Sequence, residues 1–316
     1  MVGKPFPSGH PLADRRAAYA ETMAHLGDIP VAIEVLAGAL SLAPDWAAGW
    51  FRLGEFLEMV GAKDEAADAW RKAQAADPAD PFGAGLKLDL MRDIPVTENI
   101  PPAFVELLFD QYAPRFDKSL VEALDYRGPA LLLSALQADG FTHATQALDL
   151  GCGTGLMGEE LRPFCDWLGG IDISQGMLDE AAAKGVYDEL SKQDIGTLAL
   201  ATTTYDLIVA ADVFIYLGAL ERIIGWIAGA LAPQGRLAFT IERGTAPVEL
   251  RESRRFAHSP TYIAEVLEAA GFHAIQLHDC VLRQDRGVDI EALCVVASRG
   301  KVAPSIDRRN LSLDHA

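Results

Sequence analysis

The pattern of apolar and polar positions changes in character along the 316-residue chain. Up to residue 138 the apolar residues recur at helical spacing, and from residue 146 short apolar runs alternate with amphipathic stretches. The apolar runs predict strands at residues 147–150, 167–171, 205–211, 236–241, 273–277 and 291–297. Helices are predicted between the earlier runs, at residues 156–161, 175–184 and 217–231. Strands that alternate with helices predict a mostly parallel sheet with right-handed crossovers.

Turn residues mark the end of the predicted sheet. Ser259 is the expected N-cap of a further helix, Pro260 occupies its first turn, and Gly271 ends it. The last two strands follow without a helix between them and are separated by a loop near residues 284–287. We therefore predict an antiparallel hairpin at the edge of the sheet.

The N-terminal part of the chain contains a repeat with a period of 34 residues. The shift superimposes Gly27 on Gly61, Ala32 on Ala66, Leu36 on Trp70, Ala39 on Ala73 and Pro44 on Pro78. Small residues such as Ala66 and Ala73 suit closely crossing helices, and Pro78 ends the unit. With Trp50, Leu53, Gly54 and Leu57 in the second copy, the pattern resembles the tetratricopeptide repeat. A pair of helical hairpins without repeat ancestry is the alternative.

These patterns predict four segments. A helical repeat module ends in a capping helix, a proline-rich linker follows, and further helices at residues 104–112 and 128–138 precede the first strand. The predicted boundaries are 13–91 for the repeat module, 92–102 for the linker, 103–300 for the sheet domain and 301–316 for a polar tail.

Charge and cysteine usage narrow the classes of function. The formal net charge of -18 repels phosphate backbones, so nucleic acid is not expected as a partner. The four cysteines form no CxxC pair and no His/Cys cluster has metal-ligand spacing, so no metal is expected. We find no apolar segment of signal-peptide length at the N-terminus and no apolar run that could span a bilayer. These features predict a reduced, cytoplasmic protein without a membrane segment.

The densest chemical signal follows the first predicted strand and reads Asp149-Leu150-Gly151-Cys152-Gly153-Thr154-Gly155. Glycines let the chain turn sharply and let a ligand approach the backbone, and the next helix points N–H groups at it. A dinucleotide loop reads GxGxxG, but Leu156 stands at its last glycine position. Asp149 would repel a pyrophosphate and attract the ammonium group of a methionine moiety, unless it caps a neighbouring helix.

Further carboxylates follow later strands, at the edge where ligands bind in such sheets. Asp172 is placed to accept both hydroxyls of a ribose, and Asp194 to meet an adenine amino group with Ile195 against the ring. Asp194 is otherwise an ordinary loop carboxylate. Asp212 follows the strand at residues 205–211, at the same edge. Cys152 is interpreted as a small neutral filler of the glycine loop.

Residues 147–155, 171–174, 193–195 and 205–216 resemble the successive motifs of class I S-adenosylmethionine-dependent methyltransferases. The whole chain resembles bacterial predicted methyltransferases with N-terminal tetratricopeptide repeats. This resemblance implies an α/β, Rossmann-like, mostly parallel sheet with an antiparallel edge strand, and S-adenosylmethionine as cofactor. It also implies a helical lid over residues 109–117. The cofactor residues expected are Tyr112, Phe116, Asp149, Gly151, Cys152, Gly153, Gly155, Asp172, Ile173, Met177, Asp194, Ile195 and Asp212, although Met177 also suits the core.

The methyl acceptor is expected between the strand at residues 236–241 and the helix that begins at Pro260. Arg255 is a candidate for holding an anionic acceptor, and His258 for taking or orienting a proton, unless it only caps that helix. Tyr216 is a further catalytic candidate. The acceptor is predicted to be a small molecule or a carrier- or protein-borne group of unknown identity. A non-catalytic adaptor that retains the cofactor is the competing class, and the repeats are predicted to serve self-association or protein docking.

Overall fold

The computed structural model describes residues 6–92, 100–117, 125–285 and 287–299. Contacts divide the chain into two compact units, residues 1–111 with 250–255 and residues 112–249 with 256–316. The predicted sheet domain began at residue 103, whereas the contacts group residues 103–111 with the helices of the first unit. Most of the predicted linker and the whole predicted tail lie outside the described residues.

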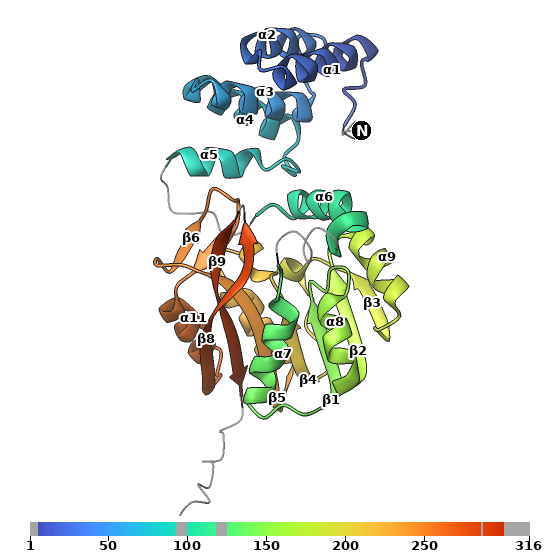
Figure 1. Ribbon diagram of the computed structural model, residues 1–316, viewed down its shortest axis with the longest axis vertical. Helices are drawn as coiled ribbons and strands as arrows, with labels where there is room; N and C mark the ends of the chain where they lie inside the picture. The colour runs from blue at the N-terminus through green and yellow to red at the C-terminus, as the bar shows by residue number, and fades with distance from the viewer. Residues whose placement is uncertain (1–5, 93–99, 118–124, 286, 300–316) are drawn as a thin grey trace, which may run out of the picture. The chain divides into compact units, whose positions relative to one another are not determined.

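The first unit is built from successive helices (Figure 1). Their bounds are α1 Pro11–His25, α2 Ile29–Leu40, α3 Ala47–Met59, α4 Lys63–Ala76, α5 Ala84–Arg92 and α6 Pro102–Tyr112. Helices α1 and α2 form one hairpin and α3 and α4 a second, and the turns that end α1 and α3 contain Gly27 and Gly61 at φ +87° and +79°. Both glycines adopt the left-handed conformation that favours glycine. The two predicted units are therefore two hairpins with matching turns.

One side chain fixes the packing of the second hairpin. Trp70 of α4 is fully buried, and its Nε1 donates a hydrogen bond to the Phe51 carbonyl at 3.2 Å. The indole ring lies against the backbone of Gly54, where any Cβ would overlap it. Gly54 therefore allows the close approach of α3 and α4 that the repeat pattern predicts.

The rings of Trp46, Trp50 and Phe51 lie at the start of the second hairpin. Phe51 is buried and both tryptophans are half-buried. The exposed apolar side chains of this unit include Leu26 after α1 and Val60 after α3, with exposed fractions of 72% and 48%.

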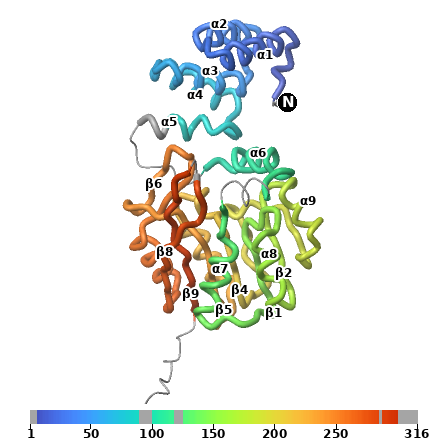
Figure 2. The backbone as a smooth tube through the Cα atoms, in the orientation of Figure 1, coloured from blue at the N-terminus to red at the C-terminus, as the bar shows by residue number. Residues whose placement is uncertain are grey.

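The second unit is a twisted sheet flanked by helices (Figure 2). Its strands are β1 Ala144–Leu150, β2 Cys165–Asp172, β3 Glu189–Lys192, β4 Tyr205–Ala210, β5 Leu231–Arg243, β6 Val248–Leu250, β7 Phe256–His258, β8 Ala274–Asp285 and β9 Val288–Ser298. The parallel order is β3-β2-β1-β4-β5, and β9 pairs antiparallel with both β5 and β8. The predicted parallel sheet and antiparallel hairpin are confirmed. Strand order reverses between β1 and β4, so the ligand crevice is expected at their carboxyl ends.

Helices cover both faces of this sheet. Helices α7 Gly128–Ala138 and α8 Leu156–Leu161 pack with Leu168, Val209 and Val296 in one buried cluster. Helices α10 Glu221–Ala230 and α11 Pro260–Ala269 pack on the other face, in a cluster that includes Leu150 and Phe239. Helix α9 Gln175–Lys184 follows β2. The alternation of inward and outward residues along each strand produces the two cores.

The predicted helices at residues 128–138, 156–161 and 175–184 match the structure residue for residue. Ser259 caps α11 as predicted, because its Oγ accepts a hydrogen bond from the Tyr262 backbone N–H. Strands β3, β6 and β7 were not predicted, since they contain three or four residues each and show no periodic pattern.

Candidate functional site

The glycine loop after β1 takes a conformation that only glycine adopts readily. Gly151, Gly153 and Gly155 have φ values of +64°, +54° and +91°. A Cβ on Gly151 would overlap the Val213 side chain, so this turn requires close approach. A Cβ on Gly153 would meet no described atom within 4 Å, so open space lies beside this part of the loop. The loop can therefore admit a ligand against its backbone.

Asp149 lies beneath this loop and is completely buried. The Tyr187 hydroxyl donates a hydrogen bond to its Oδ2 at 2.7 Å, but its buried Oδ1 has no hydrogen-bond partner among the described residues. Burial raises the pKa of the Asp149 carboxyl to about 7, although the Tyr187 hydrogen bond works in the opposite direction. Tyr187 was missed at the sequence level because it stands after α9, far along the chain from the strand it serves.

Asp172, at the end of β2, holds the loop in place. Its Oδ2 accepts from the Gly153 backbone N–H at 2.9 Å and its Oδ1 accepts from the Ser174 N–H at 2.8 Å. A carboxylate has about four lone-pair sites and can accept from several donors at once, hydroxyls among them. The structure thus brings Asp172 to the glycine loop, where the sequence placed it.

The other predicted cofactor residues have structural partners of their own. The Asp194 Oδ1 accepts from the Gly196 N–H at 2.8 Å and so organises its own loop. Met177 is buried, Ile173 and Ile195 are half-buried, and Ile195 packs against the core. Burial raises the pKa of the Cys152 thiol, which is consistent with a neutral filler.

The segment after α6 reaches the glycine loop through Asp117. This carboxylate accepts a hydrogen bond from the Thr154 hydroxyl and pairs with Lys184 Nζ at 2.8 Å. Phe116 is half-buried beside it, whereas Tyr112 is exposed. The predicted lid is therefore tied to the loop by Asp117, which the sequence analysis did not single out as a contact residue.

A buried ionic cluster lies at the same edge of the sheet, beyond β4. Arg283 of β8 is 1% exposed and pairs with Asp212 Oδ2 at 2.6 Å and with Glu242 Oε1 at 2.5 Å. Burial raises the pKa of Tyr126 well above its ordinary value, and the negative charge of Asp212 adds to this effect. Tyr216 also interacts electrostatically with Arg283. The cluster joins residues from four separate parts of the chain.

The predicted acceptor residues differ in their surroundings. Arg255 is half-buried and directly precedes β7, while His258, the last residue of β7, is fully buried. His258 Nε2 lies 2.9 Å from the Gly218 carbonyl oxygen and its ring stacks on Tyr262, with centroids 5.7 Å apart. Burial lowers the pKa of His258. Because a carbonyl only accepts, Nε2 carries the proton, and the buried Nδ1 has no partner in the described part of the chain. The catalytic role of Arg255 with His258 stays a prediction.

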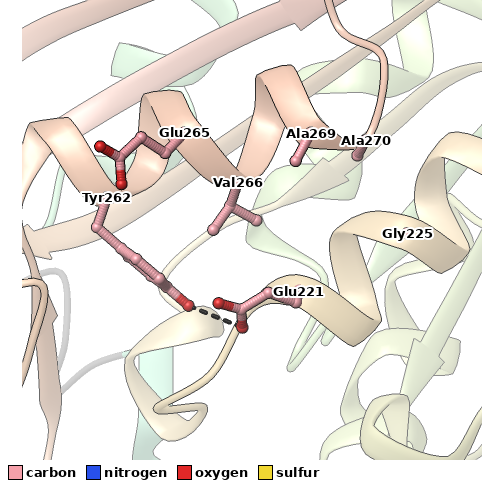
Figure 3. Close-up of a pocket in the computed structure, with 7 residues that line it drawn as sticks. All are labelled: Glu221, Gly225, Tyr262, Glu265, Val266, Ala269 and Ala270. Atoms are coloured by element: carbon pink, nitrogen blue, oxygen red, sulfur yellow. Dashed lines mark hydrogen bonds between the residues drawn. The ribbon is translucent and has the colours of Figure 1, made fainter.

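A surface groove runs between α10 and α11 (Figure 3). It is lined by Glu221, Gly225, Tyr262, Glu265, Val266, Ala269 and Ala270. The Tyr262 hydroxyl donates to Glu221 Oε2 at 3.0 Å and accepts from the Leu220 N–H at 2.9 Å. No residue of the glycine loop lines this groove, so it is separate from the site beside Asp149.

Comparisons with known proteins agree with this geometry. Residues 148–239 match the family described as a methyltransferase domain. The chain is 40% identical over 106 residues to human methyltransferase-like protein 27, covering 32% of this chain and 43% of that one. It is 28% identical over 151 residues to a malonyl-acyl-carrier-protein O-methyltransferase of Enterobacter lignolyticus, covering 48% and 58%. The chain thus spans about half the length of these relatives.

A solved structure shares the fold. The chain superimposes with a TM-score of 0.50 and 18% identity on a structure of the complex between the Haloferax volcanii Trm112 methyltransferase activator and a methyltransferase, over 61% of this chain and 98% of that one. This similarity, with the matching family, establishes a class I fold. The segment that matches the methyltransferase-domain family contains the glycine loop, Asp172 and Asp194.

The site beside the glycine loop has residues that fit S-adenosylmethionine. The buried Asp149 Oδ1 lacks a partner among the described residues, and an ammonium group is a suitable donor for it. Open space beside Gly153 suits the rest of the molecule, and the Asp172 carboxylate is held at the same loop. Within the described ranges, no group of three or more His, Cys, Asp and Glu residues could hold a metal ion, and no helix is long and apolar enough to cross a membrane.

Proposed function

We propose that the protein transfers a methyl group from S-adenosylmethionine to an acceptor bound beside the carboxyl ends of β1 and β4. The observation that carries this proposal is the buried, half-satisfied carboxylate of Asp149 beneath an open glycine loop. Leaving a buried acceptor unpaired costs roughly 1–3 kcal/mol, so the fold retains a group that a ligand would satisfy. An adaptor without turnover, which is the competing class, would not require the ionic cluster of Asp212, Glu242 and Arg283 at the same edge of the sheet.

The residues of the donor site have distinct roles in this proposal. Asp149 binds the ammonium group, Asp172 accepts from the ribose hydroxyls, and Asp194 with Ile195 meets the adenine. Gly151, Cys152, Gly153 and Gly155 form the wall, and Ile173 and Met177 support it. Phe116 and Tyr112 belong to the lid, which Asp117 ties to Thr154 and Lys184.

S-adenosylmethionine supplies a methyl carbon already activated by the adjacent sulfonium. The chain itself must align the acceptor with this carbon and exclude water, and alignment alone contributes roughly 7–11 kcal/mol. A general base is needed only where the acceptor arrives protonated. The buried position of Asp149, Glu242 and Arg283 shows that this edge of the sheet excludes water.

Calorimetry with S-adenosylhomocysteine tests the proposal directly, with NAD as the competing ligand. We expect 1:1 binding of S-adenosylhomocysteine and none of NAD. Asp172→Ala should weaken binding at least about tenfold, because the ribose hydroxyls lose a charged acceptor and Gly153 loses its anchor. Binding of NAD without S-adenosylhomocysteine would refute the proposal.

We also propose that the helical hairpins are tetratricopeptide-like repeats that serve self-association or protein docking. The support is the 34-residue spacing of equivalent exposed residues, since Leu26 and Val60 occupy matching turns. Exposed apolar side chains on a short helical array favour association. Light scattering on the full chain should show an oligomer that Leu26→Ser with Val60→Ser dissociates. A monomeric full chain would refute self-association.

A further inference from the structure

We infer that the methyl acceptor is a protonated amine, held by Asp212 within the cluster that Asp212, Glu242 and Arg283 form. This inference rests on the proposed methyl transfer and names its substrate class. It assigns Asp212 to the acceptor rather than to the cofactor.

The position of Asp212 is set by the donor loop. The residue follows β4, which pairs with β1 through Asp149 and Val209. Its neighbour Val213 packs its side chain against Gly151, the first glycine of the loop. Asp212 therefore lies next to the loop that surrounds the donor, on the side of β4.

The charge of the cluster favours a cationic ligand. Arg283 is paired with both carboxylates at 2.6 and 2.5 Å, so its positive charge is already compensated. Arg283 faces two carboxylates, and Asp212 keeps a second oxygen that Arg283 does not engage. An anionic acceptor would be repelled there, and an ammonium group would be attracted.

One oxygen of the cluster is available to such a ligand. The Asp212 Oδ2 accepts from Arg283, but its buried Oδ1 has no hydrogen-bond partner among the described residues. The backbone of Asp212 is left-handed at φ +61°, and its N–H donates to Thr240 Oγ1 at 2.7 Å. Non-glycine residues adopt this conformation at a cost, typically where a site requires it. The bond from Arg283 to Oδ2 fixes the direction of the unpaired Oδ1.

Arg283 acts as a positioning residue. The register of β8 against β9 shifts between Val281 and Arg283, and this bulge leaves both Leu282 and Arg283 buried. Bulges redirect side chains beside functional sites. The guanidinium therefore reaches Asp212 and Glu242 from a strand that would otherwise turn it outward.

The chemical step balances without a further reactant. The ammonium group first gives one proton to Asp212 Oδ1, the oxygen to which it is hydrogen-bonded. The amine lone pair then forms the new C–N bond as the bond between methyl carbon and sulfur breaks, and sulfur keeps that electron pair. The product is a methylated ammonium beside a neutral thioether, and the proton on Asp212 leaves to water.

Matched acceptors test this inference. With labelled S-adenosylmethionine, we would compare benzylamine with benzyl alcohol and benzoate, and hexylamine with hexanol and hexanoate. We expect label in the amines only. Asp212→Asn should lower kcat/KM for the better amine about 100-fold, the effect of removing one partner from a charged, buried pair. Binding of S-adenosylhomocysteine should change less than about threefold.

Asp279→Asn is the matched control, because Asp279 is an exposed carboxylate on the same strand as Arg283. It should leave both measurements unchanged. Label in an alcohol or carboxylate, or no label in either amine, would overturn the inference, whatever the stability of the variant. If Asp212→Asn lost as much S-adenosylhomocysteine affinity as kcat/KM, Asp212 would belong to the donor site. A wild-type protein that does not bind S-adenosylhomocysteine would instead contradict methyl transfer itself.

Discussion

Two carboxylates at the carboxyl ends of neighbouring strands, the buried Asp149 and the half-buried Asp212, differ in the group that holds them. Asp149 accepts from the phenol of Tyr187, and Asp212 accepts from the guanidinium of Arg283. Each leaves its Oδ1 buried without a partner in the described ranges. A phenol brings no charge, so burial keeps the pKa of Asp149 at about 7 and the carboxylate gains its charge when a cation arrives. A guanidinium carries a permanent charge, so the acceptor end of the site, at Asp212, contains an ion pair before any ligand binds.

The largest effect should follow from removing the Arg283 guanidinium from its cluster with Asp212 and Glu242. Arg283→Met leaves Asp212 and Glu242 buried without their cation, so the free energy of unfolding should fall by about 3–5 kcal/mol. Urea denaturation measures this loss. Arg243→Met is the control, because Arg243 pairs with the exposed Asp279 at 3.2 Å and such pairs contribute at most about 1 kcal/mol. Similar losses in both variants would show that the cluster is not an energetic unit.

The residues around Asp149 and those around Asp212 also differ in how far they could be predicted from the sequence. The donor loop is contiguous, so its glycines and Asp149 could be identified from one strand, one turn and one helix. Arg283 lies 71 residues from Asp212 in the chain, and the bulge in β8 disrupts the alternation that would mark an inward charged residue. Tyr187 lies 38 residues from Asp149. Contacts between segments far apart in the chain leave no pattern in the local sequence. In this site, such contacts determine which group stands beside each carboxylate.

Contacts between distant segments also determine the surroundings of the acceptor residues expected between the strand at residues 236–241 and the next helix. His258 and Arg255 lie close in sequence, but His258 is fully buried against Tyr262, whereas Arg255 is half-buried. The burial of His258 involves Gly218, 40 residues earlier in the chain, so no local pattern predicts it. The helices and main strands were predictable because each carries its own periodic pattern.

The adjustable charge of Asp149 predicts a pH dependence of donor-site binding. Below its pKa of about 7 the carboxyl must lose a proton to bind an ammonium group. The affinity for S-adenosylhomocysteine should therefore rise about tenfold per pH unit from pH 5.5 towards 7 and then level off. Asp149→Asn should abolish this slope. Calorimetry across this range measures it, and a flat profile in the wild type would contradict the role of Asp149.

The same pKa shift has a defined sign for stability without ligand. The folded protein keeps the Asp149 proton up to about pH 7, while the unfolded chain loses it near pH 4, so the folded state binds more protons between these values. This group therefore makes the protein less stable as pH rises across that window. Urea midpoints of Asp149→Asn should lack this contribution.

Removing the phenol should have the smallest effect. Tyr187→Phe deletes the hydrogen bond to Asp149 Oδ2 and should cost about 1 kcal/mol of stability. Because that bond lowers the pKa of Asp149, its loss should move the rise in S-adenosylhomocysteine affinity to higher pH. Tyr205→Phe is a suitable control, since Tyr205 lies at the start of β4, away from the carboxyl ends. An unchanged profile in Tyr187→Phe would mean that the phenol does not tune the carboxylate.

The central claim is that the site has a donor end at Asp149 and an acceptor end at Asp212. The most direct test is calorimetry with S-adenosylhomocysteine at pH 8 on Asp149→Asn and Asp212→Asn. Each variant replaces one carboxylate by an amide of the same shape. We predict that Asp149→Asn weakens binding at least about tenfold, because the ligand's ammonium group loses its charged partner. Asp212→Asn should bind within about threefold of the wild type, because its partners lie at the acceptor end. Equal losses in the two variants, or a loss in Asp212→Asn alone, would contradict the division of the site into a donor end and an acceptor end.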